Sequence, residues 1–330
     1  MPTAAVVGCG DVSIVHFEAI ERLAGVELVG VCDVDPAAAA QAHERWGVAA
    51  FHDHRALLAA LRPDIVHVCT PHDQHAPVVI DCLESRVAVI VEKPLAATMP
   101  EAEKIITAAA EQPQIKIGVC LQNRYNATIQ AIRAQLDTGQ LGKVLGGHGT
   151  VMWRRTATYY TSRPWRGRIA NSGGGVLINQ AIHTLDLLQW LLGDVSAVDG
   201  HASRSRTAPG VDVEDTATLM LDHTSGAHSM LVASTANVVD SPITLEIDTE
   251  YATFFVRGDL TVRHADGRVE VVRERSALSE GRGYWGVSHQ LLIEDFYDRL
   301  KDPQPFWLSP LEAAKSQRII EQVYTGSYAG

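Results

Sequence analysis

Residues 6–13 read Val-Val-Gly-Cys-Gly-Asp-Val-Ser, an apolar run that enters a glycine-rich turn. Gly8 permits a tight turn after a strand, and Gly10 lets the backbone approach a pyrophosphate closely. Ser13 stands where a Gly-x-Gly-x-x-Gly pattern has its third glycine, and its small side chain still allows close helix packing. The N-terminus of a helix that begins here favours an anion. The stretch predicts a dinucleotide-binding turn formed by Gly8, Gly10, Asp11, Val12 and Ser13.

The residues that follow this turn alternate short apolar runs with stretches whose apolar side chains recur at helical spacing. Strands that are apolar on both faces and alternate with helices indicate a parallel sheet covered on each side. Right-handed crossovers then give a doubly wound α/β domain, a Rossmann domain, over residues 1–122. Its expected strands are Ala4–Val7, Glu27–Cys32, Ile65–Cys69, Val87–Val91 and Ile115–Val119, and its expected helices are Val12–Ala24, Pro36–Trp46, Arg55–Leu61, Gln74–Ser85 and Met99–Glu111.

A different pattern follows Asn123 and predicts an α+β domain over residues 123–330. Alternating side chains and tight turns between Val195 and Arg273 indicate an open, mostly antiparallel sheet. Residues 156–172 are polar and aromatic without periodicity, and we expect a loop there, of a length that is usually functional or disordered. The expected helices are Ala127–Asp137, Gly173–Leu192, Val287–Leu300 and Leu311–Tyr324, and the expected strands are Lys143–Arg155, Thr216–Leu221, Gly226–Thr235, Ile243–Asp248, Ala252–Val256 and Arg268–Val272.

The overall composition limits the class of protein. The chain has 330 residues, enough for two domains, and its net charge of −11 without a strongly basic segment argues against nucleic-acid binding. No apolar run approaches the ~18 residues of a membrane span. Asp11 and Glu18 interrupt the first apolar stretch, so we expect no signal peptide and a cytoplasmic protein. The five cysteines form no Cys-x-x-Cys pair, and we expect buried free thiols and no metal site.

An acidic residue follows the second expected strand at the position that dinucleotide-binding folds use for the adenosine ribose. Asp33 lies 23 residues after Gly10. A carboxylate there can accept hydrogen bonds from both ribose hydroxyls and repels a 2′-phosphate. We therefore expect NAD as the cofactor in preference to NADP, which stays possible. The alternative is a turn residue that precedes Asp35 and Pro36.

The expected strand Ile65–Cys69 ends in Thr70-Pro71-His72-Asp73-Gln74-His75. Ligands of doubly wound sheets bind at the carboxyl ends of the strands. Thr70, Pro71 and His75 are therefore candidate cofactor contacts. Capping of the next helix is the alternative for Thr70 and His75.

Glu92-Lys93-Pro94 follows another apolar strand, where a lysine is unusual. Pro94 removes a backbone donor and turns the chain. Burial near a positively charged nicotinamide would lower the proton affinity of Lys93 toward that of a useful acid or base. The alternative is a lysine that snorkels from a strand end. Glu92 pairs in this interpretation with a ribose hydroxyl of the cofactor or with a neighbouring base.

The helix expected after the three glycines 173–175 carries a narrow polar stripe. Asn179, His183 and Asp186 fall within about 60° of arc at ~100° per residue, among apolar neighbours. His183 is a candidate for catalysis or substrate binding, against the alternative of a hydrogen-bonded core histidine. Asp186 is expected to orient His183 or to cap a neighbouring group.

Aromatic and arginine side chains around this helix are candidates for the walls of a substrate site. An aromatic ring can stack on the apolar face of a sugar, and an arginine can hold a phosphate or a carboxylate. Each is also explained by packing or by surface charge. The candidates are Arg124, Tyr125, Trp153, Arg154, Tyr159, Tyr160, Trp165 and Arg166.

Together these motifs resemble the Gfo/Idh/MocA family of oxidoreductases, typified by glucose-fructose oxidoreductase and inositol dehydrogenase. The resemblance implies a Rossmann domain followed by a domain with an open sheet that commonly mediates dimers or tetramers. It implies oxidation or reduction of a hydroxyl or ketone on a sugar, cyclitol or sugar nucleotide. It also implies that Lys93 and His183 transfer the proton. The matching residues are Gly8–Ser13, Asp33, Thr70-Pro71, Glu92-Lys93-Pro94, Gly173-Gly174-Gly175, His183 and Asp186.

One position departs from the inositol dehydrogenase pattern, in which an aspartate precedes the histidine by four residues. Asn179 stands there and cannot act as a base, although it can bind a substrate hydroxyl. We therefore expect a sugar or sugar-nucleotide substrate bound by Lys93, Asn179 and His183. Two other functions share nearly the same motifs, namely an NAD-dependent glycoside hydrolase that acts by oxidation and elimination, and a non-catalytic dinucleotide sensor. Retention of Lys93 and His183 argues against the sensor.

Overall fold

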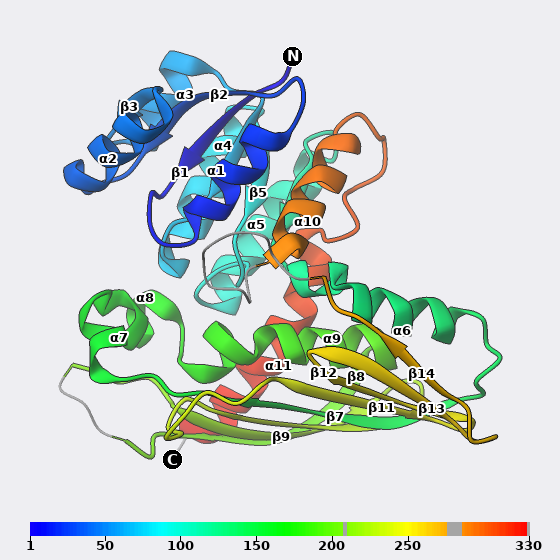
Figure 1. Cartoon of the computed structure of the whole chain (residues 1–330). Helices are drawn as coiled ribbons and strands as arrows, with labels where there is room; N and C mark the ends of the chain where they lie inside the picture. The colour runs from blue at the N-terminus through cyan, green and yellow to red at the C-terminus, as the bar shows by residue number, and fades with distance from the viewer. Residues whose placement is uncertain (207–209, 276–285, 329–330) are drawn as a thin grey trace. The chain divides into compact units, whose positions relative to one another are not determined.

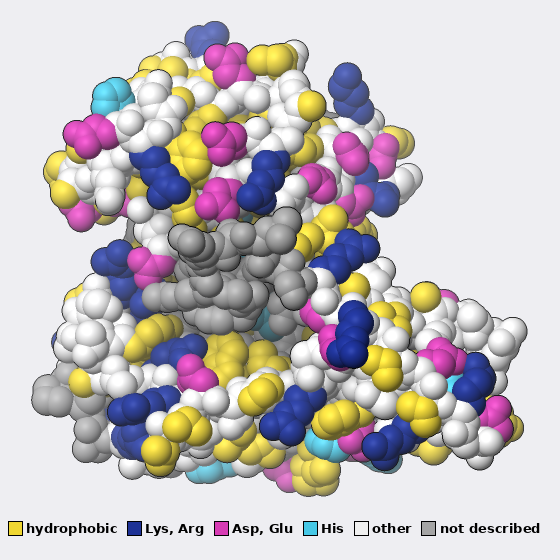
Figure 2. All heavy atoms as spheres, viewed as in Figure 1, with side chains coloured by type: hydrophobic (Ala, Val, Ile, Leu, Met, Phe, Trp, Pro, Cys, Tyr) yellow, Lys and Arg dark blue, Asp and Glu magenta, His cyan; other side chains and the backbone are white. Residues whose placement is uncertain are grey.

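The computed structural model describes residues 1–206, 210–275 and 286–328 (Figure 1). The contacts among them divide the chain into two compact units. The first unit contains residues 1–122 and 286–314, and the second contains residues 123–275 and 315–328. None of the described helices is long and apolar enough to cross a membrane. Figure 2 shows acidic and basic side chains interspersed over the visible surface of each unit.

The described residues of the first unit form a six-stranded sheet in the order β3-β2-β1-β4-β5-β6, with every neighbouring pair parallel. This confirms the predicted doubly wound parallel sheet. The strands are β1 (Thr3–Val7), β2 (Glu27–Cys32), β3 (Ala49–Phe51), β4 (Ile65–Val68), β5 (Ala88–Val91) and β6 (Ile117–Val119). The helices are α1 (Ser13–Arg22), α2 (Pro36–Trp46), α3 (His54–Leu61), η1 (His72–Gln74), α4 (His75–Glu84) and α5 (Met99–Glu111).

Local chemistry explains where these elements begin and end. Asp35 caps α2 by accepting from the Ala37 backbone N–H at 3.0 Å, and Pro36 occupies the first turn. Strands β4 and β5 are buried along nearly their whole length, as expected for central strands of a covered sheet. Strand β3 was not predicted, since three residues at the edge of a sheet carry too little periodicity to stand out.

A segment from the C-terminal part of the chain completes the first unit. Helix α10 (Gly286–Asp298) packs on α1, and Arg22 Nη1 donates to Gln290 Oε1 at 2.8 Å. Phe296 packs over Gly118, where a Cβ would lie only 2.8 Å from the ring. The prediction that assigned all of residues 123–330 to the second domain was therefore wrong for 286–314. The reason is that the apolar face of α10 is buried against the first unit.

The second unit is built on an eight-stranded sheet in the order β14-β13-β12-β11-β7-β10-β9-β8. Among the described strands of this sheet, only β7 and β10 pair in parallel, which confirms the expected mostly antiparallel sheet. Strands β8 and β13 were not predicted. The strands are β7 (Val144–Met152), β8 (Val195–Ser203), β9 (Thr216–His223), β10 (His228–Ser234), β11 (Thr244–Thr249), β12 (Ala252–Arg257), β13 (Asp259–His264) and β14 (Val269–Val272).

Helices cover one face of this sheet, as Figure 1 shows for α9 and α11. Leu185 and Leu188 of α9 and Ile320 of α11 belong to one core with sheet residues such as Leu231 and Ile247. The expected loop at 156–172 contains three short helices, and the expected helix after the glycines begins with a π-helical turn. The helices are α6 (Ala127–Asp137), α7 (Ala157–Thr161), η3 (Pro164–Gly167), α8 (Ile169–Ser172), η4 (Leu177–Ala181), α9 (Ile182–Leu192) and α11 (Pro310–Tyr328); a further short turn, η2, spans Gln122–Tyr125.

Candidate cofactor and substrate sites

The glycine-rich turn between β1 and α1 leaves room for a ligand. Gly8 has φ +94°, and a Cβ there would lie 2.6 Å from the Cys69 carbonyl group, so only glycine fits. Gly10 is the opposite case, because no atom lies within 4 Å of the Cβ position. Ser13 Oγ donates to the Gly10 carbonyl at 2.6 Å and closes the turn at the start of α1. The turn therefore combines a fixed backbone with open space at a helix N-terminus, the features that hold a pyrophosphate.

Asp33 at the end of β2 is held beside this turn. Its Oδ2 accepts from the Cys9 backbone N–H at 2.7 Å, and its Oδ1 accepts from the Asp35 backbone N–H at 2.9 Å. Each carboxylate oxygen keeps a second lone pair, so the group can still accept from ribose hydroxyls. The turn role and the cofactor role of Asp33 are thus compatible.

The segment after β4 is tied to the segment after β5 by a histidine. His75 is fully buried, with Nδ1 2.8 Å from the Pro94 carbonyl oxygen and Nε2 3.0 Å from the Thr70 carbonyl oxygen. Burial lowers the pKa of His75, so the neutral ring donates to one carbonyl at a time. These contacts favour a positioning role for His75 over the direct cofactor contact that the sequence suggested. They fix Thr70 and Pro71 relative to the Lys93–Pro94 peptide, which is cis.

Glu92 points into the first unit. It is 5% exposed, and its Oε1 accepts from Nε2 of His16 and Nε2 of His289, each at 3.1 Å. The Lys93 backbone N–H donates to the other oxygen at 3.3 Å. The observed partners match the neighbouring-base alternative for Glu92. They disfavour the ribose contact.

The Glu92 cluster continues through two more side chains. His16 Nδ1 lies 2.9 Å from His67 Nδ1, and His67 Nε2 lies 2.9 Å from the Tyr297 hydroxyl. Burial lowers the pKa of both His16 and His67. Burial opposes ionisation of Glu92 as well, but the hydrogen bonds from His16 and His289 hold the pKa of its carboxyl well below the usual range. In this cluster Glu92 is therefore ionised, and burial favours the neutral form of His16 and His67.

A thiol also borders this cluster. One nitrogen of His16, one oxygen of Glu92 and the sulfur of Cys120 lie within 4.8 Å of one another. Burial raises the pKa of the Cys120 thiol well above its usual value, so the thiolate that binds metals is disfavoured. His16 and Glu92 are already hydrogen-bonded to each other. These donors fit a hydrogen-bonded cluster better than a cation site.

In the second unit, the three polar residues expected on one helix, Asn179, His183 and Asp186, have different surroundings. Asp186 accepts from Arg124 in a bidentate pair, with distances of 2.8 Å to Nε and 2.7 Å to Nη2. Arg124 is 0% exposed, and its guanidinium also lies 5.0 Å from the centre of the Trp190 ring. This favours a structural role for Arg124 over substrate contact and agrees with the structural role expected of Asp186. Asn179 and His183 remain half-buried.

Asn179 adjoins the aromatic segment. The Tyr159 hydroxyl accepts from Gln180 Nε2 at 3.0 Å and lies 3.4 Å from Asn179 Nδ2. Asn179 and Gln180 lie in the π-helical turn η4, a feature frequent at functional sites. Arg166 stacks on the Tyr159 ring at 4.6 Å, and Arg155 stacks on it at 5.3 Å. The structure thus brings the polar helix and the aromatic segment together within one unit.

The other residues predicted to line the substrate site differ in their burial and in their contacts. Trp165 lies under Arg166, with 5.7 Å from the guanidinium to the ring, and Trp153 lies under Arg155, with 4.7 Å. Tyr160 packs edge-on against Tyr159, and burial raises its pKa. Arg154 is exposed, while Tyr125 is half-buried at the end of η2. Arg155 was missed by the sequence analysis, although it follows a named arginine directly.

Glu214 and Tyr324, which were not predicted, explain why glycines occupy positions 174 and 175. Glu214 accepts from the backbone N–H groups of Gly175 at 2.6 Å and Leu177 at 3.0 Å, and from the Tyr324 hydroxyl at 2.7 Å. A Cβ on Gly175 would lie 1.8 Å from the Glu214 carbonyl oxygen, and one on Gly174 would lie 2.2 Å from the Tyr324 hydroxyl. Glu214 and Tyr324 therefore anchor the start of the helix that presents Asn179.

Profiles of one protein family match residues in each of the two units. A family profile described as an oxidoreductase family with an NAD-binding Rossmann fold matches residues 3–119. A profile described as the GFO/IDH/MocA C-terminal domain matches residues 129–255. The chain belongs to the Gfo/Idh/MocA oxidoreductase family. Family membership confirms the predicted resemblance and NAD as the cofactor of this fold.

Individual relatives differ in their named substrates. The D-apiose dehydrogenase of Paraburkholderia graminis is 30% identical over 71% of this chain, and the match spans 60% of that protein. An inositol 2-dehydrogenase of Salmonella typhimurium is 22% identical over 98% of this chain and 95% of its own length. The WlbA dehydrogenase of Chromobacterium violaceum, solved with NADH and UDP-GlcNAcA, has a TM-score of 0.86 and 27% identity, covering 100% of this chain and 94% of its own.

Proposed function

We propose that this protein transfers a hydride between nicotinamide and a hydroxyl or ketone carbon of a sugar, cyclitol or sugar nucleotide, using NAD. The observation that carries the proposal is the turn at Gly8–Ser13 with the Asp33 carboxylate fixed on it, in a chain of this family. Relatives named for apiose and inositol, and a similar structure solved in complex with UDP-GlcNAcA, support the substrate class.

The proposed division of labour follows the two units. The turn would bind the pyrophosphate of NAD and Asp33 its adenosine ribose, and NAD bound there would supply hydride-transfer chemistry. In the oxidation direction the hydrogen would leave the substrate carbon with the electron pair of the C–H bond, as a hydride. The amine of Lys93 or the imidazole of His183 would take the proton of the hydroxyl group. Asn179 binds a substrate hydroxyl, and Tyr125, Trp153, Arg154, Tyr160 and Trp165 line the substrate site.

The experiment that tests the function is a panel of free sugars, cyclitols and nucleotide sugars, read by the absorbance of reduced cofactor with NAD and NADP in parallel. Formation of reduced cofactor with one class of substrate supports the proposal. Turnover of a glycoside without net reduced cofactor would favour the elimination mechanism instead. Binding of NAD without turnover of any member would contradict the assignment as a dehydrogenase.

The carboxylate of Asp33 should set the preference for NAD. Asp33→Asn keeps an oxygen that can accept from the Cys9 N–H but removes the charge that repels a 2′-phosphate. We expect the ratio of kcat/KM for NAD over NADP to fall by about 10- to 100-fold, since hydrogen bonds to charged groups contribute about 1.5–3 kcal/mol. Asp53→Ala, which removes the α3 cap, is the matched control and should leave the ratio unchanged. An unchanged ratio in Asp33→Asn would assign the preference to other residues.

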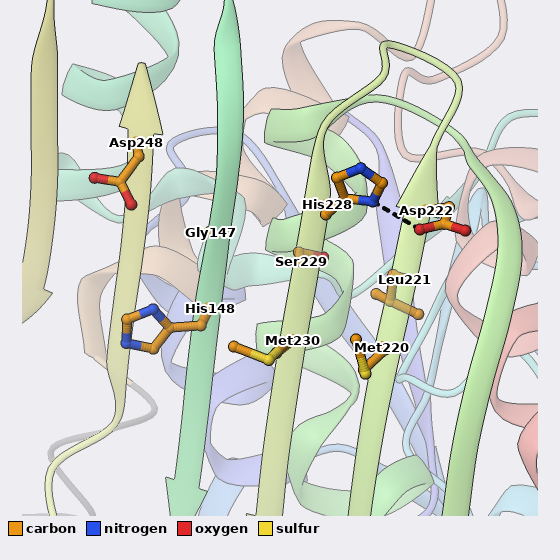
Figure 3. Close-up of a pocket in the computed structure, with 9 residues that line it drawn as sticks. All are labelled: Gly147, His148, Met220, Leu221, Asp222, His228, Ser229, Met230 and Asp248. Carbon is orange, nitrogen blue, oxygen red and sulfur yellow. Dashed lines mark hydrogen bonds and ion pairs between the residues drawn. The ribbon is translucent and has the colours of Figure 1, made fainter. Parts of the chain in front are cut away.

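We further propose that the uncovered face of the large sheet joins copies of this chain into a homodimer or homotetramer. Met220, Met230 and Val232 lie 61%, 51% and 38% exposed on β9 and β10. Figure 3 shows the two methionines side by side near His148 in a shallow hollow on that face. Exposed apolar clusters of this kind commonly mark interfaces.

The assembly is tested by the molar mass from light scattering after size exclusion. Met230→Lys should lower the mass to that of one chain at micromolar concentration, because the lysine would have to be desolvated in the interface. Leu311→Lys, at a position 58% exposed in the first unit, should leave the mass unchanged. A single-chain mass for the unmodified protein would refute the proposal.

A further inference from the structure

The hydrogen bonds around Glu92 can be assigned in one direction. An ionised carboxylate accepts, so Nε2 of His16 and of His289 must each carry a proton. His16 is then a neutral ring whose Nδ1 accepts, and His67 Nδ1 must donate to it. His67 Nε2 accepts in turn from the Tyr297 hydroxyl. This assignment satisfies each of these hydrogen-bonding atoms, and the reversed assignment would aim a lone pair of His16 at the carboxylate.

This arrangement suits a fixed charge better than a proton relay. Carrying a proton along the chain would require Tyr297 to ionise, and burial raises the pKa of that phenol. It would also require a charged His67, and burial lowers the pKa of that ring. The stable state therefore has Glu92 as an anion and His16, His67 and Tyr297 neutral.

The Glu92 carboxylate accepts a hydrogen bond from the backbone N–H of Lys93, the residue proposed to move the substrate proton. We propose that His16 and His289 are positioning residues that keep Glu92 ionised against the Lys93 backbone, and that this charge sets the pH range over which the Lys93 amine exchanges its proton. The inference rests on the proposed function, because it assigns the proton to Lys93. It adds to that site two histidines that do not contact the substrate. One of them, His289, is hydrogen-bonded to Glu92 across 197 residues of sequence.

The other titratable groups that sense this charge do not replace it. Glu92 acts electrostatically on His75 after β4, on Cys69 and on Cys120 after β6, and Lys93 acts on His75 and Cys120. Burial keeps His75 neutral and both thiols protonated. Of the groups that lie around Lys93 in these interactions, Glu92 is therefore the acidic group that is ionised.

Three variants separate the effect of the Glu92 charge from the effect of side-chain packing around it. Glu92→Gln removes the charge and keeps an oxygen that accepts from both histidines. His289→Phe removes one donor and keeps an aromatic ring, so burial should neutralise Glu92. His289→Gln restores an N–H near the position of Nε2. His223→Gln is the control, because His223 is also buried between two hydrogen-bond partners, Gly193 and Ser229, but lies in the second unit.

The readout is the pH midpoint for acetylation of Lys93, measured by peptide mass spectrometry against the exposed Lys104, together with the pH profile of kcat/KM for substrate oxidation. An anion favours the ammonium form of an amine near it, so removal of the Glu92 charge should move both midpoints to lower pH, by up to about one unit. We expect this shift in Glu92→Gln and His289→Phe, and wild-type midpoints in His289→Gln and His223→Gln.

Wild-type midpoints in Glu92→Gln and His289→Phe would overturn the inference, and so would a shift in His289→Gln as large as in His289→Phe. The labelling midpoint does not require turnover, so it distinguishes this inference from the proposed function. A labelling shift without a shift of the kcat/KM profile would support the effect of the Glu92 charge on the Lys93 amine and would contradict the assignment of Lys93 as proton carrier.

Discussion

Replacing Lys93 with methionine is expected to lower kcat by about 10²- to 10⁴-fold, the usual contribution of a positioned general acid or base. Methionine keeps the length and apolar stem of the side chain but cannot bind a proton. The glycine turn and Asp33 are untouched, so the dissociation constant for NAD should change by no more than a few-fold. Steady-state rates with the best substrate, and NAD binding by calorimetry, measure the two quantities.

Lys104→Met on the exposed surface of α5 is the matched control for Lys93→Met and should retain full activity. His183→Ala, tested beside it, shows how the proton work is shared. Full activity in Lys93→Met with a large loss in His183→Ala would transfer the role to His183. Full activity in both would remove the proposed mechanism.

Replacing Asp186 with alanine is expected to cost about 3–5 kcal/mol of unfolding free energy, because it leaves the Arg124 guanidinium buried without its bidentate partner. Ser316 Oγ, which donates to Asp186 at 3.0 Å, would lose its acceptor as well. Urea denaturation followed by tryptophan fluorescence measures the change, since Trp190 lies against Arg124.

The exposed pair Arg133–Asp137 provides the comparison for Asp186. Asp137 is more than half exposed, and Asp137→Ala should cost about 0.5 kcal/mol or less. The double variant Arg124→Met with Asp186→Leu should recover most of the stability lost in Asp186→Ala, because no buried charge remains. A loss below about 1 kcal/mol in Asp186→Ala would show that Arg124 reaches another compensating partner.

Local signals made the first unit predictable. The turn at residues 6–13 and the acid at Asp33 depend on contacts close in sequence or on one strand–turn–helix unit, so composition and spacing sufficed. Lys93 stood out for a similar reason, as a charged residue at the end of an apolar run. The structure confirms the parallel sheet that these signals predicted.

Contacts between distant segments were beyond the sequence analysis. His289 and Tyr297 reach Glu92 and His67 across 197 and 230 residues, and nothing in their local pattern distinguishes them from other polar residues on a helix. For the same reason α10 was assigned to the wrong unit. Arg124 looked like a substrate ligand because a sequence shows the charge but does not show the buried carboxylate that neutralises it.

We propose as the central claim that Lys93 and His183, which belong to different units of the chain, both contact the substrate group whose carbon exchanges a hydride with nicotinamide, and that one of them moves the proton of its oxygen. A crystal structure with NAD and the substrate identified by the panel tests this most directly. The account predicts that the Lys93 amine or the His183 imidazole lies within about 3.2 Å of the reacting oxygen and that the other also contacts the substrate. Bound NAD and substrate that neither side chain contacts would contradict it.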